Sequence, residues 1–188
     1  MASDVAHDAL ARAFPDGPFE FEARGEDGSR RRAHAWYVYT GPGDDFTRAL
    51  AAAEEHVVRL VRRLLLDHPL DPRRGAIAGY SQGAYLAGFV AFRNTSLFPR
   101  GAALASGRLK DEVLAREISS APDYPVLLVH GEKDRAVPFE FAERGKAALE
   151  RAGHRASRLV AVPGGHAFSP AMRREVRGFL ESVLDLPS

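Results

Sequence analysis

One serine in this sequence lies in a setting that can turn its hydroxyl group into a nucleophile. Ser81 is the middle residue of the run GYSQG at residues 79–83, which fits the pattern G-x-S-x-G. In that pattern the serine occupies a tight turn from a strand to a helix, and the helix N-terminus faces a developing oxyanion. The pattern predicts acyl transfer at Ser81; the alternative is that Ser81 only caps the helix that follows.

A histidine is the natural base for such a serine, because the hydroxyl is a poor nucleophile until its proton is removed. His166 lies in the run PGGHAF at residues 163–168, between the last strand and the last helix that the sequence predicts. Two glycines directly before a histidine suit a residue that has to reach over the end of a sheet. We therefore expect His166 to act as the base; the alternative is a loop histidine that contacts solvent.

A third group has to orient the imidazole and stabilise its charged form. Asp134 ends the run GEKD at residues 131–134, which follows an apolar segment, so it would lie at the carboxyl end of a parallel strand. Glu132 in the same loop is the alternative acid, and Asp111 and Asp123 are less well placed. We interpret His130 as a structural residue at the end of the strand.

Short apolar segments alternate with amphipathic segments over most of the chain, which predicts an α/β fold with a mostly parallel sheet flanked by helices. We expect strands at 75–79, 102–105, 126–130 and 158–162. We expect a helix from Gln82 to about Asn94 and a weak one at 113–118. A further helix opens at Pro138 with Gly153 past its end, and the last begins at Pro170, capped by Ser169.

The first third of the chain predicts a helix from Ser3 or Asp4 through Ala13, a strand at 19–23 and an extended segment at 36–40. The clearest helix of all is expected at 44–66, with its apolar residues on one face. The basic run at residues 30–32 is expected in a solvated polar loop, with a phosphate-binding patch as the alternative.

Composition excludes several classes of protein. The chain has 188 residues, which favours a single domain over residues 1–188. It contains no cysteine, so thiolate chemistry and disulfides are excluded. A net charge of +1 argues against a nucleic-acid partner. Neither a secretory signal nor an apolar stretch of about 18 residues is apparent, so we expect a cytoplasmic protein without stable membrane insertion.

Several segments together resemble the small phospholipase/carboxylesterase group of α/β-hydrolases, which includes acyl-protein thioesterases. The matching segments are AWY at 35–37, the helix with Asp45 near its start, GYSQG at 79–83, ASG at 105–107, HGEKD at 130–134 followed by VP at 137–138, and GGH at 164–166. They follow the family's order from about residue 35 to the end.

This resemblance implies a serine carboxylester hydrolase that cleaves small esters, thioesters or lysophospholipid-type substrates without a metal or organic cofactor. It implies Ser81 as nucleophile, Asp134 as orienting acid and His166 as base. The Gln82 N–H would be one oxyanion donor. Trp36 would lie near the acyl or leaving-group pocket, although a lone tryptophan can equally be core. The alternatives are a serine peptidase of the same fold and an inactive, ligand-binding relative.

The sequence departs from this family at its N-terminal end. Members start with a buried strand and a His-Gly loop that supplies a second oxyanion N–H, whereas residues 1–13 already resemble the helix that follows them. We therefore expect an N-terminally shortened α/β-hydrolase fold with weak or partner-dependent activity. A misassigned or trimmed start, closure of the gap by another segment or subunit, and a degraded relative are the alternatives. The oligomeric state stays open, with a homodimer as one arrangement.

Overall fold

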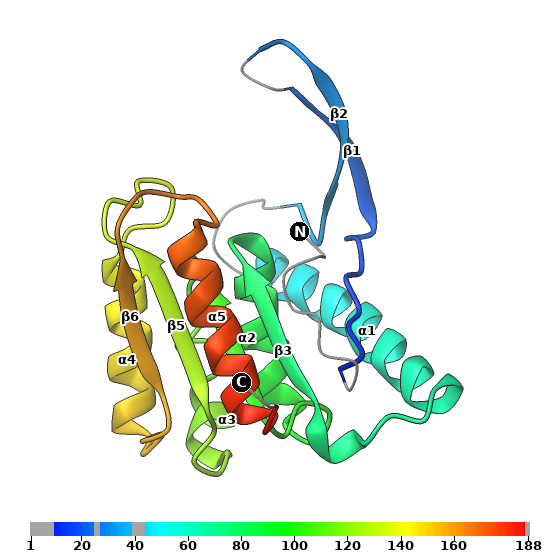
Figure 1. The fold of residues 1–188 in the computed structure, drawn as a ribbon, viewed down its shortest axis with the longest axis vertical. Coiled ribbons are helices and arrows are strands. Elements are labelled where there is room, and N and C mark those ends of the chain that lie inside the picture. The colour runs from blue at the N-terminus through cyan, green and yellow to red at the C-terminus, as the bar shows by residue number, and fades with distance from the viewer. Residues whose placement is uncertain (1–9, 25–26, 39–43, 187–188) are drawn as a thin grey trace.

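A four-stranded parallel sheet forms the centre of the molecule (Figure 1). The structure is a computed structural model that describes residues 10–24, 27–38 and 44–186. The strands lie in the order β3 (Ala76–Tyr80), β4 (Gly101–Ala105), β5 (Val126–Gly131) and β6 (Arg158–Val162). Strands β4 and β5 are buried along their whole length and consist almost entirely of apolar residues, as expected for the middle of a parallel sheet.

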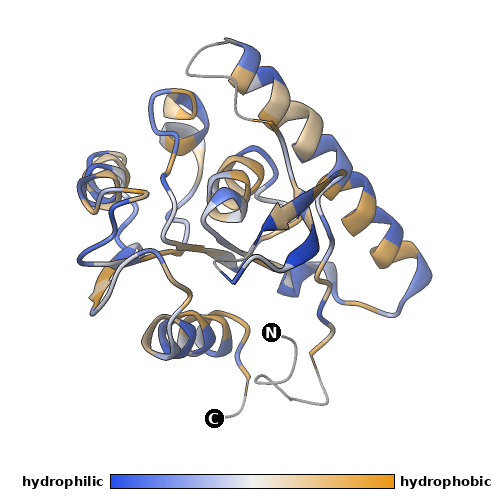
Figure 2. Cartoon of the chain, turned by 90° about the horizontal axis from the view of Figure 1, so that it is seen from above, coloured by the Kyte–Doolittle hydropathy of each residue, from blue (hydrophilic) through white to orange (hydrophobic). Residues whose placement is uncertain are grey.

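Helices cover both faces of this sheet, as Figure 2 shows from above. On one face pack α1 (Asp44–Asp67), α2 (Gln82–Arg93) and α4 (Glu140–Arg151), with the short α3 (Ala115–Ser120) beside α2. On the other face packs α5 (Pro170–Val183). Alternate residues of β4 and β5 face the two layers: Leu104 packs with α2 and Leu128 with α4, whereas Ala103 and Leu127 pack with α5.

These elements confirm the α/β architecture expected from the sequence. Each of the four strands and the helices after residue 80 lies where the patterns placed it, to within about two residues at either end. The largest shifts are in α3, which begins at Ala115 rather than Val113, and in α4, which begins at Glu140 rather than Pro138. Pro170 begins α5, and the Ser169 hydroxyl accepts a hydrogen bond from the Met172 N–H, which caps the helix as predicted.

The basic run at residues 30–32 is not a loop, and that prediction was wrong. It belongs to β2 (Arg30–Ala35), which pairs antiparallel with β1 (Phe19–Arg24) in a separate two-stranded ribbon. Arg32 Nε lies 3.0 Å from Glu20 Oε1, and Arg30 lies 3.4 Å from Glu22. Cross-strand pairs of opposite charge stabilise an antiparallel ribbon, and a local charge count does not show them.

The remaining predictions for the first third of the chain fare unevenly. The helix at 44–66 is confirmed as α1, and the strand at 19–23 is confirmed as β1. The extended segment at 36–40 was misplaced, because the strand ends at Ala35 and the chain bends at Trp36 and Tyr37; residues 39–40 lie outside the described residues. Residues 10–13 have no helical structure, and the rest of the helix expected there also lies outside the described residues.

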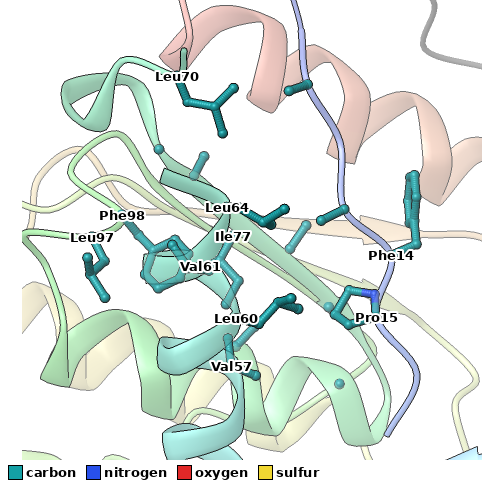
Figure 3. Close-up of a pocket in the computed structure, with 18 of the residues that line it drawn as sticks. Phe14, Pro15, Val57, Leu60, Val61, Leu64, Leu70, Ile77, Leu97 and Phe98 are labelled. Carbon is teal, nitrogen blue, oxygen red and sulfur yellow. The ribbon is translucent and has the colours of Figure 1, made fainter. Parts of the chain in front are cut away.

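Strand β3 forms one edge of the parallel sheet. Within residues 10–24, 27–38 and 44–186, no strand pairs with it on the side away from β4. On that side lies a cavity of about 830 Å³ between β3, α1 and the segment at 10–15, which Figure 3 shows in close-up. The labelled lining is almost wholly apolar and includes Phe14, Leu60, Val61 and Ile77.

Candidate active site

Ser81 lies between the end of β3 and the start of α2, in a backbone conformation that few residues adopt. Its φ of 51° and ψ of −118° are strained for a residue with a side chain. The turn depends on small neighbours: a Cβ on Gly79 would lie 2.0 Å from the Gly83 carbonyl oxygen, and one on Gly107 would lie 2.3 Å from the Ala84 Cβ. The strand-to-helix turn expected from the G-x-S-x-G pattern is therefore present.

His166 and Asp134 meet Ser81 from two other loops. His166 Nε2 lies 2.9 Å from Ser81 Oγ, and His166 Nδ1 lies 2.8 Å from Asp134 Oδ2. The three residues that the sequence singled out are thus connected by hydrogen bonds, although the serine and the histidine are 85 positions apart in the chain. With Nδ1 donating to the carboxylate, Nε2 is left to accept the serine proton.

The Asp134 carboxylate is held by the loop that carries it. Its side chain is fully buried, and Oδ1 accepts hydrogen bonds from the N–H groups of Ala136 and Val137 at 3.0 and 2.9 Å. Burial by itself would raise the pKa of Asp134, but the Val137 N–H and the His166 imidazole outweigh burial and hold the pKa below its ordinary value of 3.8. The carboxylate therefore stays charged beside His166.

The acids considered as alternatives do not reach the imidazole. Glu132 is exposed, and its N–H donates to the Val162 carbonyl. Asp123 accepts from the Ala156 N–H, and Asp111 lies against Glu112. His130 is buried and its Nε2 donates to the Val137 carbonyl at 2.8 Å, a contact that supports the loop carrying Asp134.

Gln82 and Trp36, the two further residues singled out in the sequence, also lie at this turn. Gln82 is the first residue of α2, so its N–H is one of the helix-start donors without an intrahelical partner. Trp36 is half-buried and lines the cavity beside β3. Its indole Nε1 lies 3.8 Å from where a Cβ on Gly83 would be.

Two contacts of the site escaped sequence reasoning. The ring of Tyr80, the residue before the serine, lies with its centroid 5.3 Å from that of His166 and 5.5 Å from that of Phe168. Burial and the charge of Asp134 raise the pKa of Tyr80, so its phenol is neutral. The Gln82 side chain bonds the backbone of Trp36 and Tyr37. For the contact between Tyr80 and His166, the one signal in the sequence was the aromatic residue inside the G-x-S-x-G motif. No local signal in the sequence predicts the contact of Gln82 with residues 36–37.

The molecule has the architecture of an α/β-hydrolase. A strained serine occupies the turn after a strand of a parallel sheet, and an acid and a histidine follow on later loops. The profile of the phospholipase/carboxylesterase family matches residues 14–184, and the chain belongs to that family. It is therefore a hydrolase of ester substrates.

Solved structures show the same fold. Arabidopsis thaliana SOBER1 aligns with a TM-score of 0.68 at 24% identity, over 92% of this chain and 83% of that chain. Zea mays acyl-protein thioesterase 2 aligns with a TM-score of 0.63 at 24% identity, over 81% and 74% of the two chains. Esterase PE8 aligns with a TM-score of 0.66 at 26% identity, over 81% and 71%. A comparison with curated protein sequences gave no match.

The described residues also bear on other classes of site. No helix in that part of the chain is both long and apolar enough to cross a bilayer. The same residues contain no group of three or more histidine, cysteine, aspartate or glutamate side chains placed to hold a metal ion.

Proposed function

We propose that this chain is a serine carboxylester hydrolase in which Ser81 is the nucleophile, His166 the general base and acid, and Asp134 the residue that orients His166. One observation carries the proposal: two hydrogen bonds of 2.8 and 2.9 Å connect Asp134 to His166 and His166 to Ser81, and Ser81 lies in a strained turn. This arrangement lowers the barrier to proton removal from the hydroxyl without any cofactor.

The reaction follows from these positions. Ser81 Oγ attacks the carbonyl carbon of an ester or thioester while its proton passes to His166 Nε2. The carbonyl oxygen gains negative charge, which the Gln82 N–H stabilises at the helix start. The imidazolium returns the proton to the leaving alcohol or thiol as the tetrahedral intermediate collapses to an acyl-enzyme. His166 then deprotonates a water molecule, which releases the carboxylic acid and restores Ser81.

The cavity beside β3 suits the acyl or leaving group of such a substrate. It reaches from Ser81 along the strand and is lined by aliphatic and aromatic side chains, including Trp36 and Leu86. Small esters, thioesters and lysophospholipid-type molecules share an apolar chain next to a carbonyl group. We place all three in the substrate class and favour them over oligopeptides, whose amide groups such a lining would leave without hydrogen-bond partners.

Turnover depends on how many donors meet the oxyanion. Removal of one oxyanion donor from a hydrolase typically lowers kcat by about 10²–10³-fold. A site that relies on the Gln82 N–H alone would therefore be slow and would gain from a partner that closes the β3 edge. Hydrolysis of short p-nitrophenyl esters by the purified monomer at rates typical of efficient esterases would contradict this part of the proposal.

Covalent labelling by a fluorophosphonate probe tests the nucleophile directly. The wild-type chain is expected to react and Ser81→Ala is expected to lose the label completely. Ser119→Ala is the matched control, because Ser119 is an exposed serine in α3 and should leave labelling unchanged. Continued labelling of Ser81→Ala would refute the assignment. A wild-type chain that binds ester analogues but never reacts would instead be an inactive, ligand-binding relative.

A further inference from the structure

The side chain of Gln82 bonds a segment that lies far away in sequence. Its Oε1 accepts a hydrogen bond from the Trp36 N–H at 2.8 Å, and its Nε2 donates to the Tyr37 carbonyl oxygen at 2.9 Å. We call this pair of bonds the Gln82 amide clamp. Both bonds are formed by one side-chain amide, which has an acceptor and a donor at its end, so a carboxylate or an aliphatic side chain cannot form both.

Further contacts join the same segment to the helices around the turn. The Tyr37 hydroxyl donates to the Gln82 backbone carbonyl at 3.5 Å, and the buried Tyr37 ring packs edge-on against Phe46 of α1 at 5.2 Å. The Trp36 ring lies edge-on to His56 of α1 at 6.3 Å. Trp36 and Tyr37 therefore fill the space between α1 and the start of α2.

The clamp lies at the base of the β1–β2 ribbon. Trp36 directly follows β2, and the ribbon projects away from the parallel sheet in Figure 1. A two-stranded ribbon is marginally stable in water unless something fixes it. Residues 36–37 are where this ribbon joins the body of the protein, and the clamp bonds them directly to the residue next to Ser81.

We infer that the Gln82 side chain is a positioning residue: the amide clamp holds Trp36 against the wall of the cavity and fixes the orientation of the Gln82 N–H beside Ser81. The functional half of this inference rests on the proposed hydrolase activity. The structural half, the placement of Trp36, does not. A substrate group that enters the cavity then meets a Trp36 ring whose position the nucleophile turn itself sets.

Gln82→Leu tests the clamp, because leucine is of similar size and forms neither bond. Trp36 is the single tryptophan of the chain, so its fluorescence reports on the clamp without any added label. We expect a red-shifted emission and stronger quenching by acrylamide, since the ring becomes more exposed to water. We also expect kcat/KM for p-nitrophenyl esters to fall by about 5- to 100-fold, because two backbone groups lose their partners.

Two further variants keep the test decisive. Tyr37→Phe removes only the hydroxyl bond to the Gln82 carbonyl, so the emission of Trp36 should stay as in the wild type. Gln82→Glu retains the acceptor for the Trp36 N–H and loses the donor to Tyr37, so its emission should lie between those of the wild type and Gln82→Leu. If the leucine variant does not fold, as judged by circular dichroism, the glutamate variant is measured in its place.

The outcomes separate the two proposals. A folded Gln82→Leu or Gln82→Glu variant with wild-type Trp36 emission and quenching would overturn the clamp, whatever the activity. A wild-type chain that neither reacts with a fluorophosphonate nor cleaves esters would overturn the proposed function, while the emission of Trp36 would still decide the clamp. A red-shifted Trp36 emission without loss of kcat/KM would show that the clamp places Trp36 but does not affect catalysis. That result would overturn the inference that Gln82 is a positioning residue.

Discussion

The two sides of Ser81 are built very differently. On the base side, His166 is held by a buried carboxylate, which two N–H groups fix in turn, and by the ring of Tyr80. On the side of the proposed oxyanion donor, the Gln82 N–H lies next to the edge of β3, with which no strand of the described residues pairs on that side, and next to a cavity of about 830 Å³.

This difference fits the catalytic roles that we propose for the two sides. Proton transfer requires the imidazole in one tautomer and one orientation, which only a network of fixed partners provides. The oxyanion side has to admit a substrate, so it cannot be packed in the same way. In the proposed mechanism, binding energy from the substrate then completes a site that is half rigid beforehand.

The largest test of the rigid side is Asp134→Asn. An asparagine can donate an N–H to His166 Nδ1, which favours the wrong tautomer of the imidazole. The corresponding substitution in a serine protease lowers kcat by about 10⁴-fold. We expect a loss of that order, measured by steady-state ester hydrolysis. Glu132→Gln is the matched control, because Glu132 is the exposed acid of the same loop and should have no such effect. A large loss in the Glu132 variant would reverse the assignment of the acid.

Adding one methyl group to each side compares their packing directly. A Cβ on Gly131 would lie 2.5 and 2.8 Å from the carbonyl oxygens of Gly165 and Gly164, whereas a Cβ on Gly83 would lie 3.8 Å from its nearest neighbour, Trp36 Nε1. We expect Gly131→Ala to cost about 1–3 kcal/mol of unfolding free energy. Gly83→Ala should leave stability unchanged or raise it by up to about 1 kcal/mol, because alanine favours helix.

Urea unfolding midpoints of the two glycine variants and the wild type are the measurement. Gly131→Ala should also lower kcat, since the carbonyls it displaces directly precede His166. Equal stability losses in the two variants would show that the two sides are packed alike.

The sequence was sufficient to predict that Ser81, Asp134 and His166 lie together, and insufficient to predict the contacts of Gln82 and of the ribbon, for a physical reason. Ser81, Asp134 and His166 each follow an apolar strand that local patterns reveal, and parallel strands bring their carboxyl ends to one edge. The role of Arg30 and Arg32 depends on pairing with glutamates about ten residues earlier in the chain. The bonds of the Gln82 amide reach a segment 46 residues away from it. Contacts of that kind leave no periodic signal.

Acid should weaken the rigid side through Asp134. The pKa of this carboxyl is lower in the folded chain than its ordinary value of 3.8, so the folded state binds the proton less tightly than the unfolded state does. Its contribution to stability is therefore complete above pH 3.8 and is lost as the pH falls through the lowered folded pKa. Asp134→Asn has no such contribution to lose.

The measurement is the urea midpoint of the wild type and Asp134→Asn over the acid range. The gap between the two midpoints should narrow on acidification. Burial would raise the pKa of Glu112, but the hydrogen bond from Lys110 outweighs burial and lowers that pKa to about 2. This contribution to stability is the same in both proteins, so it cancels in the difference between their midpoints. A gap that stays constant down to acid would mean that Asp134 is not held in its charged form by the fold.

The smallest expected effect concerns the ring that completes the rigid side. Tyr80 lies tilted by 31° to the imidazole, so its π face is available to the imidazolium that the proposed mechanism forms at His166. A cation beside an aromatic face gains about 0.5–1 kcal/mol at a partly exposed site. Tyr80→Leu should therefore lower kcat by about 2- to 5-fold with little change in KM, and Tyr80→Phe, which keeps the ring, should retain wild-type kcat. Equal kcat values for the leucine and phenylalanine variants would mean that Tyr80 only fills space, and the rigid side would then consist of the Asp134 network alone.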